Sequence, residues 1–364
     1  MHSAVVSMTG LALAACQAEA PDPDLSFVIE EMRATGGENA LLVADIDADG
    51  IPDLITASQD HGTVTVWQRD ADAFLTPRHT IDAGAMPNWL ADADMDGDGH
   101  VDLLIANHEQ RFLTILHGDG AGAFGRPERI ALPDALGPHP HMARPADLDG
   151  DGRMDVVVDS PESGQLFFFH RRDDGWEIET MDASGAPYLG FALADLDGDG
   201  AIDFVLPNPD HVAVRLSSRD GPITLAASGA FAVLVADING DGHDDIVAAL
   251  EGGGDNVLLY AGDGTGGFAE RPTHRFAMAS GGKGLASGDM DGDGITDIGV
   301  SSWNGGLALL RGSHAEPELV DLPLGSLSAP WGIAAGDIDA DGRAELFVAD
   351  GASDAMIMIR WNAP

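Results

Sequence analysis

DMDGDGHVD, residues 94–102, is one of seven nearly identical nine-residue stretches in this chain. The copies recur at intervals of 42 to 53 residues and follow the form Asp-x-Asp-x-Asp-Gly-x-x-Asp. Asn239 at position 3 of the fifth copy and Glu345 at position 9 of the seventh are the only exchanges at the acidic positions, and both keep an oxygen donor. Seven oxygen-rich loops at a near-regular period indicate a repeated structure with one kind of cation site.

The pattern of variation among the loops separates the roles of their positions. Positions 1, 3, 5 and 9 carry oxygen side chains, and position 6 is always glycine, which reaches left-handed backbone angles at little cost. Position 7 accepts any side chain, which indicates that its backbone carbonyl is the ligand. Hard oxygen donors in this number suit calcium. We therefore predict up to seven Ca²⁺ ions.

The predicted ligands, from loop 1 to loop 7, are Asp45, Asp47, Asp49, Ile51 and Asp53; Asp94, Asp96, Asp98, His100 and Asp102; Asp147, Asp149, Asp151, Arg153 and Asp155; Asp195, Asp197, Asp199, Ala201 and Asp203; Asp237, Asn239, Asp241, His243 and Asp245; Asp289, Asp291, Asp293, Ile295 and Asp297; and Asp337, Asp339, Asp341, Arg343 and Glu345.

Two other readings of the loops are weaker. An EF-hand needs a glutamate at position 12 and flanking helices, whereas position 12 here is never acidic, from Thr56 to Val348, and the residues after each loop read as short strands, as in VDLLIA. The second alternative, acidic turns that only raise solubility, does not explain seven identical glycine placements.

The charge of the chain excludes some partners. The formal net charge is −43, and 27 of the 61 acidic residues occupy ligand positions of the loops. Seven calcium ions would leave a charge of about −29, which still repels nucleic acid and anionic membranes. Without the ions the loop carboxylates repel one another, so we expect the fold to depend on calcium.

The single cysteine, Cys16, ends the run LAAC after a short apolar stretch. This resembles the lipobox of a bacterial lipoprotein precursor, which implies a signal peptide over residues 1–16, a lipidated cysteine and a polar tether over residues 17–24. The apolar stretch is too short to span a bilayer. The expected positive charges before it are missing, and an ordinary signal peptide with an incidental cysteine is the alternative. Either reading predicts export across the inner membrane, and the first predicts a lipid anchor on the outer membrane or cell surface.

Four strands fit into each period. In the second period they are WLADA, VDLLIA, RFLTILH and RPERIAL, and Gly-rich turns at 118–124 and 262–268 link third strands to fourth strands. Length alone would allow one large all-β domain or two smaller ones. A four-stranded unit at this period is typical of a propeller blade.

These loops and blades resemble the FG-GAP or VCBS repeat family, as in integrin α-subunit propellers. The resemblance covers residues 25–364 and implies an all-β fold: a single seven-bladed β-propeller of four-stranded blades, with the calcium loop between strands 1 and 2. Strand counting adds the closure of the ring. Residues 25–33 read as a fourth-type strand, and the chain ends after a third-type strand at 355–361, so the N-terminal strand is expected to complete the last blade.

Alternating strand direction places the calcium loops on one face and the remaining connections on the other, where we expect a ligand. Six residues before each loop, the chain places Asn39, Asn88, His141, Leu189, Phe231, Lys283 and Trp331. This ring position has no fixed chemistry, and its aromatics, amides and lysine suit sugars or a peptide. The predicted ligand-face residues are Asn88, Trp89, His139, His141, Tyr188, Lys283, Trp303 and Trp331. The alternative is that the aromatic residues only cap the inner strands.

Two functions of different class follow. The first is a non-enzymatic, calcium-binding propeller at the cell surface or in the periplasm that binds a protein or glycan, with the adhesive role implied by the family resemblance. No hydrolase elbow, Walker loop or zinc-protease motif is present in the sequence. The second is a calcium-dependent propeller enzyme such as a polysaccharide lyase, with Lys283 or His141 and Tyr188 as the base and acid.

Overall fold

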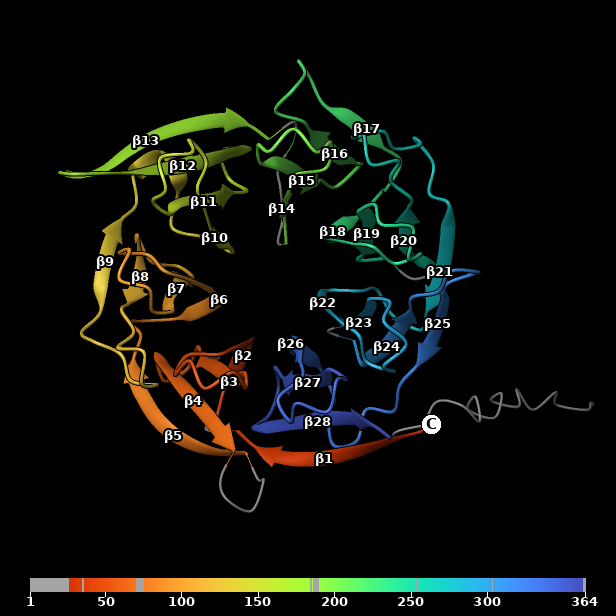
Figure 1. Ribbon diagram of the computed structural model, residues 1–364, viewed down its shortest axis with the longest axis horizontal. Helices are drawn as coiled ribbons and strands as arrows, with labels where there is room; N and C mark the ends of the chain where they lie inside the picture. The colour runs from red at the N-terminus through yellow and green to blue at the C-terminus, as the bar shows by residue number, and fades with distance from the viewer. Residues whose placement is uncertain are drawn as a thin grey trace, which may run out of the picture.

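The computed structural model describes residues 26–362, except residues 35, 70–74, 184, 186–189, 253 and 303. These residues form seven antiparallel four-stranded sheets arranged in a ring, with one edge of each sheet at the centre (Figure 1). The expected all-β, seven-bladed propeller is therefore confirmed. Within the described residues the only helical element is η1 (Asp134–Leu136), a short 3-10 turn.

Each blade runs from an innermost first strand to an outermost fourth strand. The first strands are β2 (Glu38–Ala44), β6 (Pro87–Ala93), β10 (Ala143–Ala146), β14 (Ala192–Ala194), β18 (Ala230–Ala236), β22 (Gly284–Gly288) and β26 (Pro330–Gly336). The second strands are β3 (Asp53–Ser58), β7 (Asp102–Asn107), β11 (Asp155–Ser160), β15 (Asp203–Pro207), β19 (Asp245–Leu250), β23 (Asp297–Ser302) and β27 (Glu345–Asp350). Every second strand begins at the ninth residue of its acidic loop.

The outer half of each blade completes the sheet. The third strands are β4 (Thr63–Arg69), β8 (Phe112–Leu116), β12 (Gln165–Arg172), β16 (Val212–Arg215), β20 (Gly254–Tyr260), β24 (Gly306–Arg311) and β28 (Ala355–Trp361). The fourth strands are β5 (Leu75–Asp82), β9 (Glu128–Ala131), β13 (Gly175–Asp182), β17 (Ile223–Leu225), β21 (His274–Met278), β25 (Glu318–Asp321) and β1 (Phe27–Arg33).

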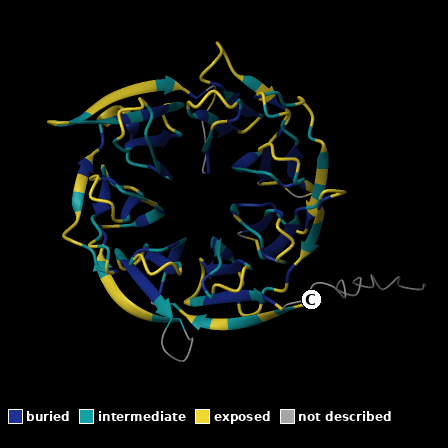
Figure 2. Cartoon of the chain, in the orientation of Figure 1, coloured by how far each residue is buried: buried dark blue, intermediate teal, exposed yellow. Residues whose placement is uncertain are grey.

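Burial falls from the second strand outwards. The sequences of the second strands, such as DLLIAN in β7, are almost continuous apolar runs, and all six residues of β7 are buried. The fourth strands instead alternate with polar residues, and the middle of β13 is exposed. Figure 2 shows this gradient, with buried second strands and exposed outer strands. A strand that is buried on both faces needs apolar residues at every position, which explains the two kinds of sequence.

The N-terminal strand closes the ring, as strand counting predicts. β1 pairs antiparallel with β28, with Phe27 opposite Trp361 and Arg33 opposite Ala355. The two ends of the colour range therefore lie side by side in Figure 1. Arg360 on β28 also forms a 2.7 Å ion pair with Glu30 on β1. This pairing removes the free edge that β28 would otherwise expose.

The core consists of seven apolar clusters, and each lies between two neighbouring blades. Position 2 of an acidic loop packs against the next blade, and position 10 packs against the preceding blade. In loop 2, Met95 joins the cluster between the second and third blades, while Leu103 joins the cluster between the first and second. Each loop is therefore anchored in two blade interfaces.

Some sequence predictions fall outside the described residues. These are the signal peptide of residues 1–16 with Cys16, the tether of residues 17–24, and the ligand-face residues Tyr188 and Trp303. Within the described part of the chain, no helix is long and apolar enough to cross a membrane.

Candidate functional site

The acidic loops are folded by hydrogen bonds from their own backbone to their carboxylates. In loop 2, Asp94 accepts bonds from the backbone N–H groups of Gly97 at 2.7 Å and Gly99 at 2.9 Å. Asp98 accepts the N–H of His100 at 2.9 Å. The last of these bonds, from position 7 to position 5, recurs in all seven loops. Gly99 has a φ of 88°, in the left-handed region that glycine favours, so the turn at position 6 accounts for the glycine there.

The carboxylate at position 9 ties the loop to the sheet. Asp102 is fully buried, and its two oxygens accept the backbone N–H groups of Met95 and Gly118, each at 2.8 Å. Asp297 makes the equivalent bonds in loop 6. Position 9 therefore fixes both the start of the loop and the end of the third strand.

The loops bring the predicted ligand oxygens together. One carboxylate oxygen from each residue at positions 1, 3 and 5 lies within 4.8 Å of the other two in loops 1, 2 and 3. At position 9, burial raises the pKa of Asp53 to about 6 and the pKa of Asp297 and Glu345 to about 7. Neighbouring loop carboxylates raise these pKa values further. Buried carboxylates crowded by like charge are stabilised by a cation, so this donor set fits a hard divalent ion.

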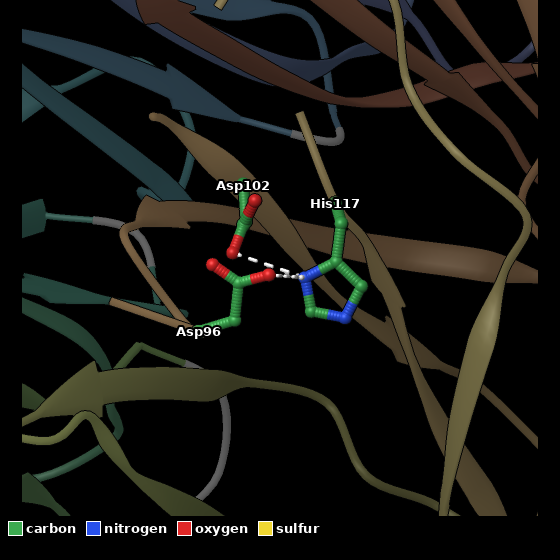
Figure 3. A group of neighbouring side chains, drawn as sticks. All are labelled: Asp96, Asp102 and His117. Carbon is green, nitrogen blue, oxygen red and sulfur yellow. Dashed lines mark hydrogen bonds and ion pairs between the residues drawn. The ribbon is translucent and has the colours of Figure 1, made fainter. Parts of the chain in front are cut away.

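The structure also reveals a position that sequence reasoning missed. This position lies across from loop position 9, near the end of the third strand or directly after it. In loop 2 it is His117, whose Nδ1 lies 3.2 Å from Asp102 and 3.5 Å from Asp96 (Figure 3). The residue differs from blade to blade. We call it the facing position, and from blade 1 to blade 7 it is Gln68, His117, His170, Leu216, Ala261, Arg311 and Arg360.

The face opposite the loops carries a cavity of about 300 Å³ at the mouth of the central channel. Five of the seven ring positions line it. These are Asn39, Asn88, His141, Lys283 and Trp331. Of the other two, Leu189 lies outside the described residues, and Phe231 is buried and does not line the cavity. The expected ligand face is thus partly assembled into one concave site, while His139 lies outside its lining.

Backbone bulges place several of these side chains. The pairing register skips Asn39 in β2, Asn88 in β6 and Trp331 in β26. A bulge leaves one residue unpaired and turns its side chain, which is common beside binding sites. The amides of Asn39 and Asn88 lie 2.9 Å apart, and Asn88 donates to the carbonyl of His141 at 3.3 Å. The bulges in β2 and β6 therefore place two amides side by side on neighbouring blades, and the second amide is bonded to the backbone of the third blade.

Two aromatic nitrogens at the cavity have no hydrogen-bond partner among the described residues. They are Nε1 of Trp89 and Nδ1 of His108, and both atoms are buried. The centre of the His108 ring lies 5.2 Å from the centre of the His141 ring and 5.3 Å from the centre of the His139 ring. Buried polar atoms without a partner are rare, so these two nitrogens are candidates for hydrogen bonds to a ligand in the cavity.

Two basic side chains in the cavity are strongly desolvated. Arg144, which sequence reasoning missed, donates to the carbonyl of Phe191 at 2.9 Å, and its guanidinium lies 5.6 Å from the ring of Trp89. Burial lowers its pKa to about 10. The Nζ atom of Lys283 lies 3.5 Å from the centre of the Trp331 ring, and burial lowers the pKa of Lys283 to about 6. Burial therefore favours the neutral amine of Lys283 in the folded chain.

This pKa gives a testable dependence of stability on pH. Between about pH 6 and pH 10.5 the unfolded chain binds a proton at Lys283 that the folded chain does not, so the free energy of unfolding rises with pH. Between pH 7.5 and 9.5 the expected contribution is about 3 kcal/mol, from about 1.4 kcal/mol per pH unit. We expect Lys283→Met to remove this slope in urea unfolding measured with saturating calcium. Parallel profiles for the two proteins would show that Lys283 is charged in the fold.

Comparisons with solved structures give the fold. A crystal structure of BBS1N in complex with ARL6DN superposes with a TM-score of 0.62 at 12% identity, covering 91% of this chain and 97% of that one. A chain of the mitotic checkpoint complex superposes with a TM-score of 0.62 at 14% identity, covering 98% of both chains. A lectin from Agrocybe aegerita superposes with a TM-score of 0.53 at 18% identity, covering 79% of this chain and 81% of that one. No curated protein sequence matches the chain.

The family follows from the repeats. The model of the FG-GAP-like repeat matches residues 45–105, 94–158, 195–248 and 237–300, more than half of the chain in total. These segments contain loops 1 to 6, and each match runs from one loop into the next. With seven four-stranded blades and an acidic loop at the start of every second strand, this chain belongs to the family of FG-GAP-like repeat proteins.

Proposed function

We propose that this chain is a non-enzymatic binding propeller, stabilised by calcium, that holds a glycan in the cavity at the channel mouth. The assignment as a binding propeller is supported by the fold and the FG-GAP-like repeats. The observation that carries the ligand is the pair of buried, unpartnered nitrogens of Trp89 and His108 beside the amides of Asn39 and Asn88.

Calcium would be held by the side chains at positions 1, 3, 5 and 9 and by the carbonyl at position 7 of each loop. The ion would supply charge neutralisation to carboxylates that the fold buries or crowds together. Asp297 supports this assignment because it is fully buried and its pKa is raised to about 7 by burial and by Asp291. Loop 5 would bind most weakly, since Asn239 supplies one charge less.

A sugar suits the cavity for chemical reasons. Its hydroxyl groups accept bonds from indole and imidazole N–H groups and exchange bonds with the amides of Asn39, Asn88 and Gln59, all of which line the site. The cavity volume of about 300 Å³ is in the range of small-ligand sites. A flat apolar patch would instead have favoured a protein partner.

Among the structural neighbours, the Agrocybe aegerita protein is a lectin that recognises non-reducing terminal N-acetylglucosamine, while BBS1N is in complex with ARL6DN and the third neighbour belongs to the mitotic checkpoint complex. Propellers of this shape thus include both glycan-binding and protein-binding members, and the amides and N–H groups in the concave cavity favour the glycan here. The lipobox-like run at Cys16 supports a place outside the inner membrane, with a lipid anchor at that cysteine.

The proposal is tested on a glycan array with the calcium-loaded chain, followed by calorimetry on the best sugar. Trp89→Phe removes the indole N–H and keeps an aromatic side chain, so we expect about 3- to 10-fold weaker binding, the usual value of one hydrogen bond. Trp361→Phe is the matched control, because its Nε1 is also buried without a partner in the described residues but lies on β28. Equal effects of the two variants, or no glycan binding at all, would contradict the proposal.

The same sugars test the enzymatic alternative, which Lys283 favours through its lowered pKa and its place in the cavity. A lyase would release unsaturated products that absorb ultraviolet light. Products that disappear in Lys283→Ala or His141→Ala would replace the binding proposal with catalysis.

A further inference from the structure

The side chain at the facing position changes the chemistry of the loops, because it differs in type from one group of blades to another. Leu216 and Ala261 leave loops 4 and 5 with oxygen ligands alone, and Gln68 adds an amide to loop 1, where it donates to Asp47 at 2.8 Å. His117 and His170 bring an imidazole nitrogen into loops 2 and 3. Arg311 and Arg360 bring guanidinium groups to loops 6 and 7.

In blades 6 and 7 the facing residue is an arginine, and its positive charge lies beside a loop carboxylate. The guanidinium of Arg311 lies 2.7 Å from Oδ2 of Asp291, which is position 3 of loop 6. Position 3 of loop 7, Asp339, is approached by Arg360 at 3.7 Å and by Arg69 at 3.5 Å. A built-in positive charge at the same carboxylate in two blades shows that the facing side chain reaches the space where a metal ion would lie. This observation is independent of the histidine blades.

In loop 2 the atoms at this place have the spacing of a metal's ligands. His117 Nδ1 lies 3.2 Å from Asp102 and 3.5 Å from Asp96, and the three ligand atoms lie within 4.8 Å of one another (Figure 3). Two ligands about 2.1 Å from a tetrahedral ion are themselves about 3.4 Å apart. Asp102 is fully buried, whereas the Asp96 side chain is 38% exposed, so the site is anchored on one side and open to ions on the other.

The other imidazole nitrogen is held from outside the loop. His117 Nε2 lies 3.0 Å from Glu128 on β9. A carboxylate on the far nitrogen of a ligating histidine fixes the ring and raises its basicity, as is usual at metal sites. Loop 3 repeats the ligand group with Asp149, Asp155 and His170, although Arg172 also donates to Asp149 at 2.7 Å.

We infer that His117 and His170 make loops 2 and 3 sites for a first-row transition ion such as Zn²⁺, with loop 2 the tighter. Imidazole suits such ions, whereas calcium prefers oxygen ligands alone. Arg172 competes for Asp149 and weakens loop 3. The inference rests on the proposed cation binding by the loops, and it divides them into histidine, amide, oxygen-only and arginine classes.

The experiment uses the full chain in excess calcium, titrated with Zn²⁺ by calorimetry and with Co²⁺ by visible absorption. Two Zn²⁺ ions are expected to bind, and the visible absorption bands of bound Co²⁺ are expected to indicate coordination by nitrogen. His117→Leu, which copies the facing residue of loop 4, is expected to weaken the tighter site at least about tenfold, because even the loss of an outer carboxylate costs about 10- to 100-fold. Glu128→Gln is expected to weaken the same site about tenfold.

A gain of binding provides the complementary test. Gln68→His places the histidine of loop 2 at the facing position of loop 1, and a third Zn²⁺ ion is expected to bind. His139→Asn, in the cluster at the channel mouth, is the control and is expected to leave all the sites intact. Zn²⁺ binding that survives His117→Leu with His170→Leu but is lost in His139→Asn would overturn the inference. Failure of the proposed calcium role is distinguishable, because calcium stabilisation is measured in the absence of Zn²⁺.

Discussion

Transfer of the calcium-loaded chain into excess EDTA is expected to lower its melting temperature by more than about 10 °C. An ion at a 100-fold excess over its Kd stabilises the fold by about 2.7 kcal/mol per site, and several loops contribute together. One kcal/mol corresponds to about 2–4 °C in domains of moderate size and to less in larger ones. The measurement is a thermal melt followed by circular dichroism, with calcium restored afterwards to show reversibility.

The control for this prediction is a single-loop variant. Asp94→Asn removes one negative charge from loop 2 and keeps an oxygen donor, so it is expected to cost only a fraction of the full EDTA effect. A melting temperature that does not change in EDTA would show that the backbone hydrogen bonds to Asp94 and its equivalents are enough to hold the loops.

Removal of the closing strand is expected to be nearly as damaging. A chain that begins at Ala34 lacks β1, so it leaves β28 as an unpaired edge and uncovers Trp361, which is 3% exposed in the closed ring. Phe27, Ile29 and Met32 of β1 pack against the clusters on either side of the last blade. Their partial burial and the lost ladder of hydrogen bonds amount to about 5 kcal/mol. We expect a melting temperature lower by about 10 °C and association of chains through β28.

The matched control is a chain that begins at Leu25, which keeps the whole strand and is expected to melt like the full-length protein. A peptide of residues 25–34, added to the shorter chain, is expected to restore the lost stability because it can pair with β28. Equal melting temperatures for the two truncated chains would mean that the ring stays closed without β1.

The sequence predicted the parts of the fold that repeat. The seven loops set the period, the apolar runs after them gave the second strands, and counting strands at both ends placed β1 beside β28. These predictions were possible because each depends on local residue type or on simple alternation. The loop residues were also identifiable, because Asp94 and its neighbours sit close in sequence.

The parts that were missed depend on register between strands. The facing position lies 15 residues after Asp102 in loop 2 but 14 after Asp297 in loop 6, so hairpin length hides the relation between His117 and Arg311. The bulge at Asn88 likewise has no signal in residue type, since it arises from a skipped pairing between β6 and β7. Arg144 belongs to no motif in the sequence, and it lines the cavity because neighbouring blades pack around it.

The anchoring of each acidic loop in two interfaces has a consequence for the ring as a whole. Met95 and Leu103 flank the same loop but pack on opposite sides of its blade, and the other loops repeat this arrangement. Each interface between neighbouring blades therefore contains apolar residues from two successive loops. A change in one loop is expected to disturb the packing of the loops before and after it. If the loops bind calcium as proposed, the loss of ions from one loop is expected to disturb the neighbouring blade interfaces as well, so its effect would extend around the ring.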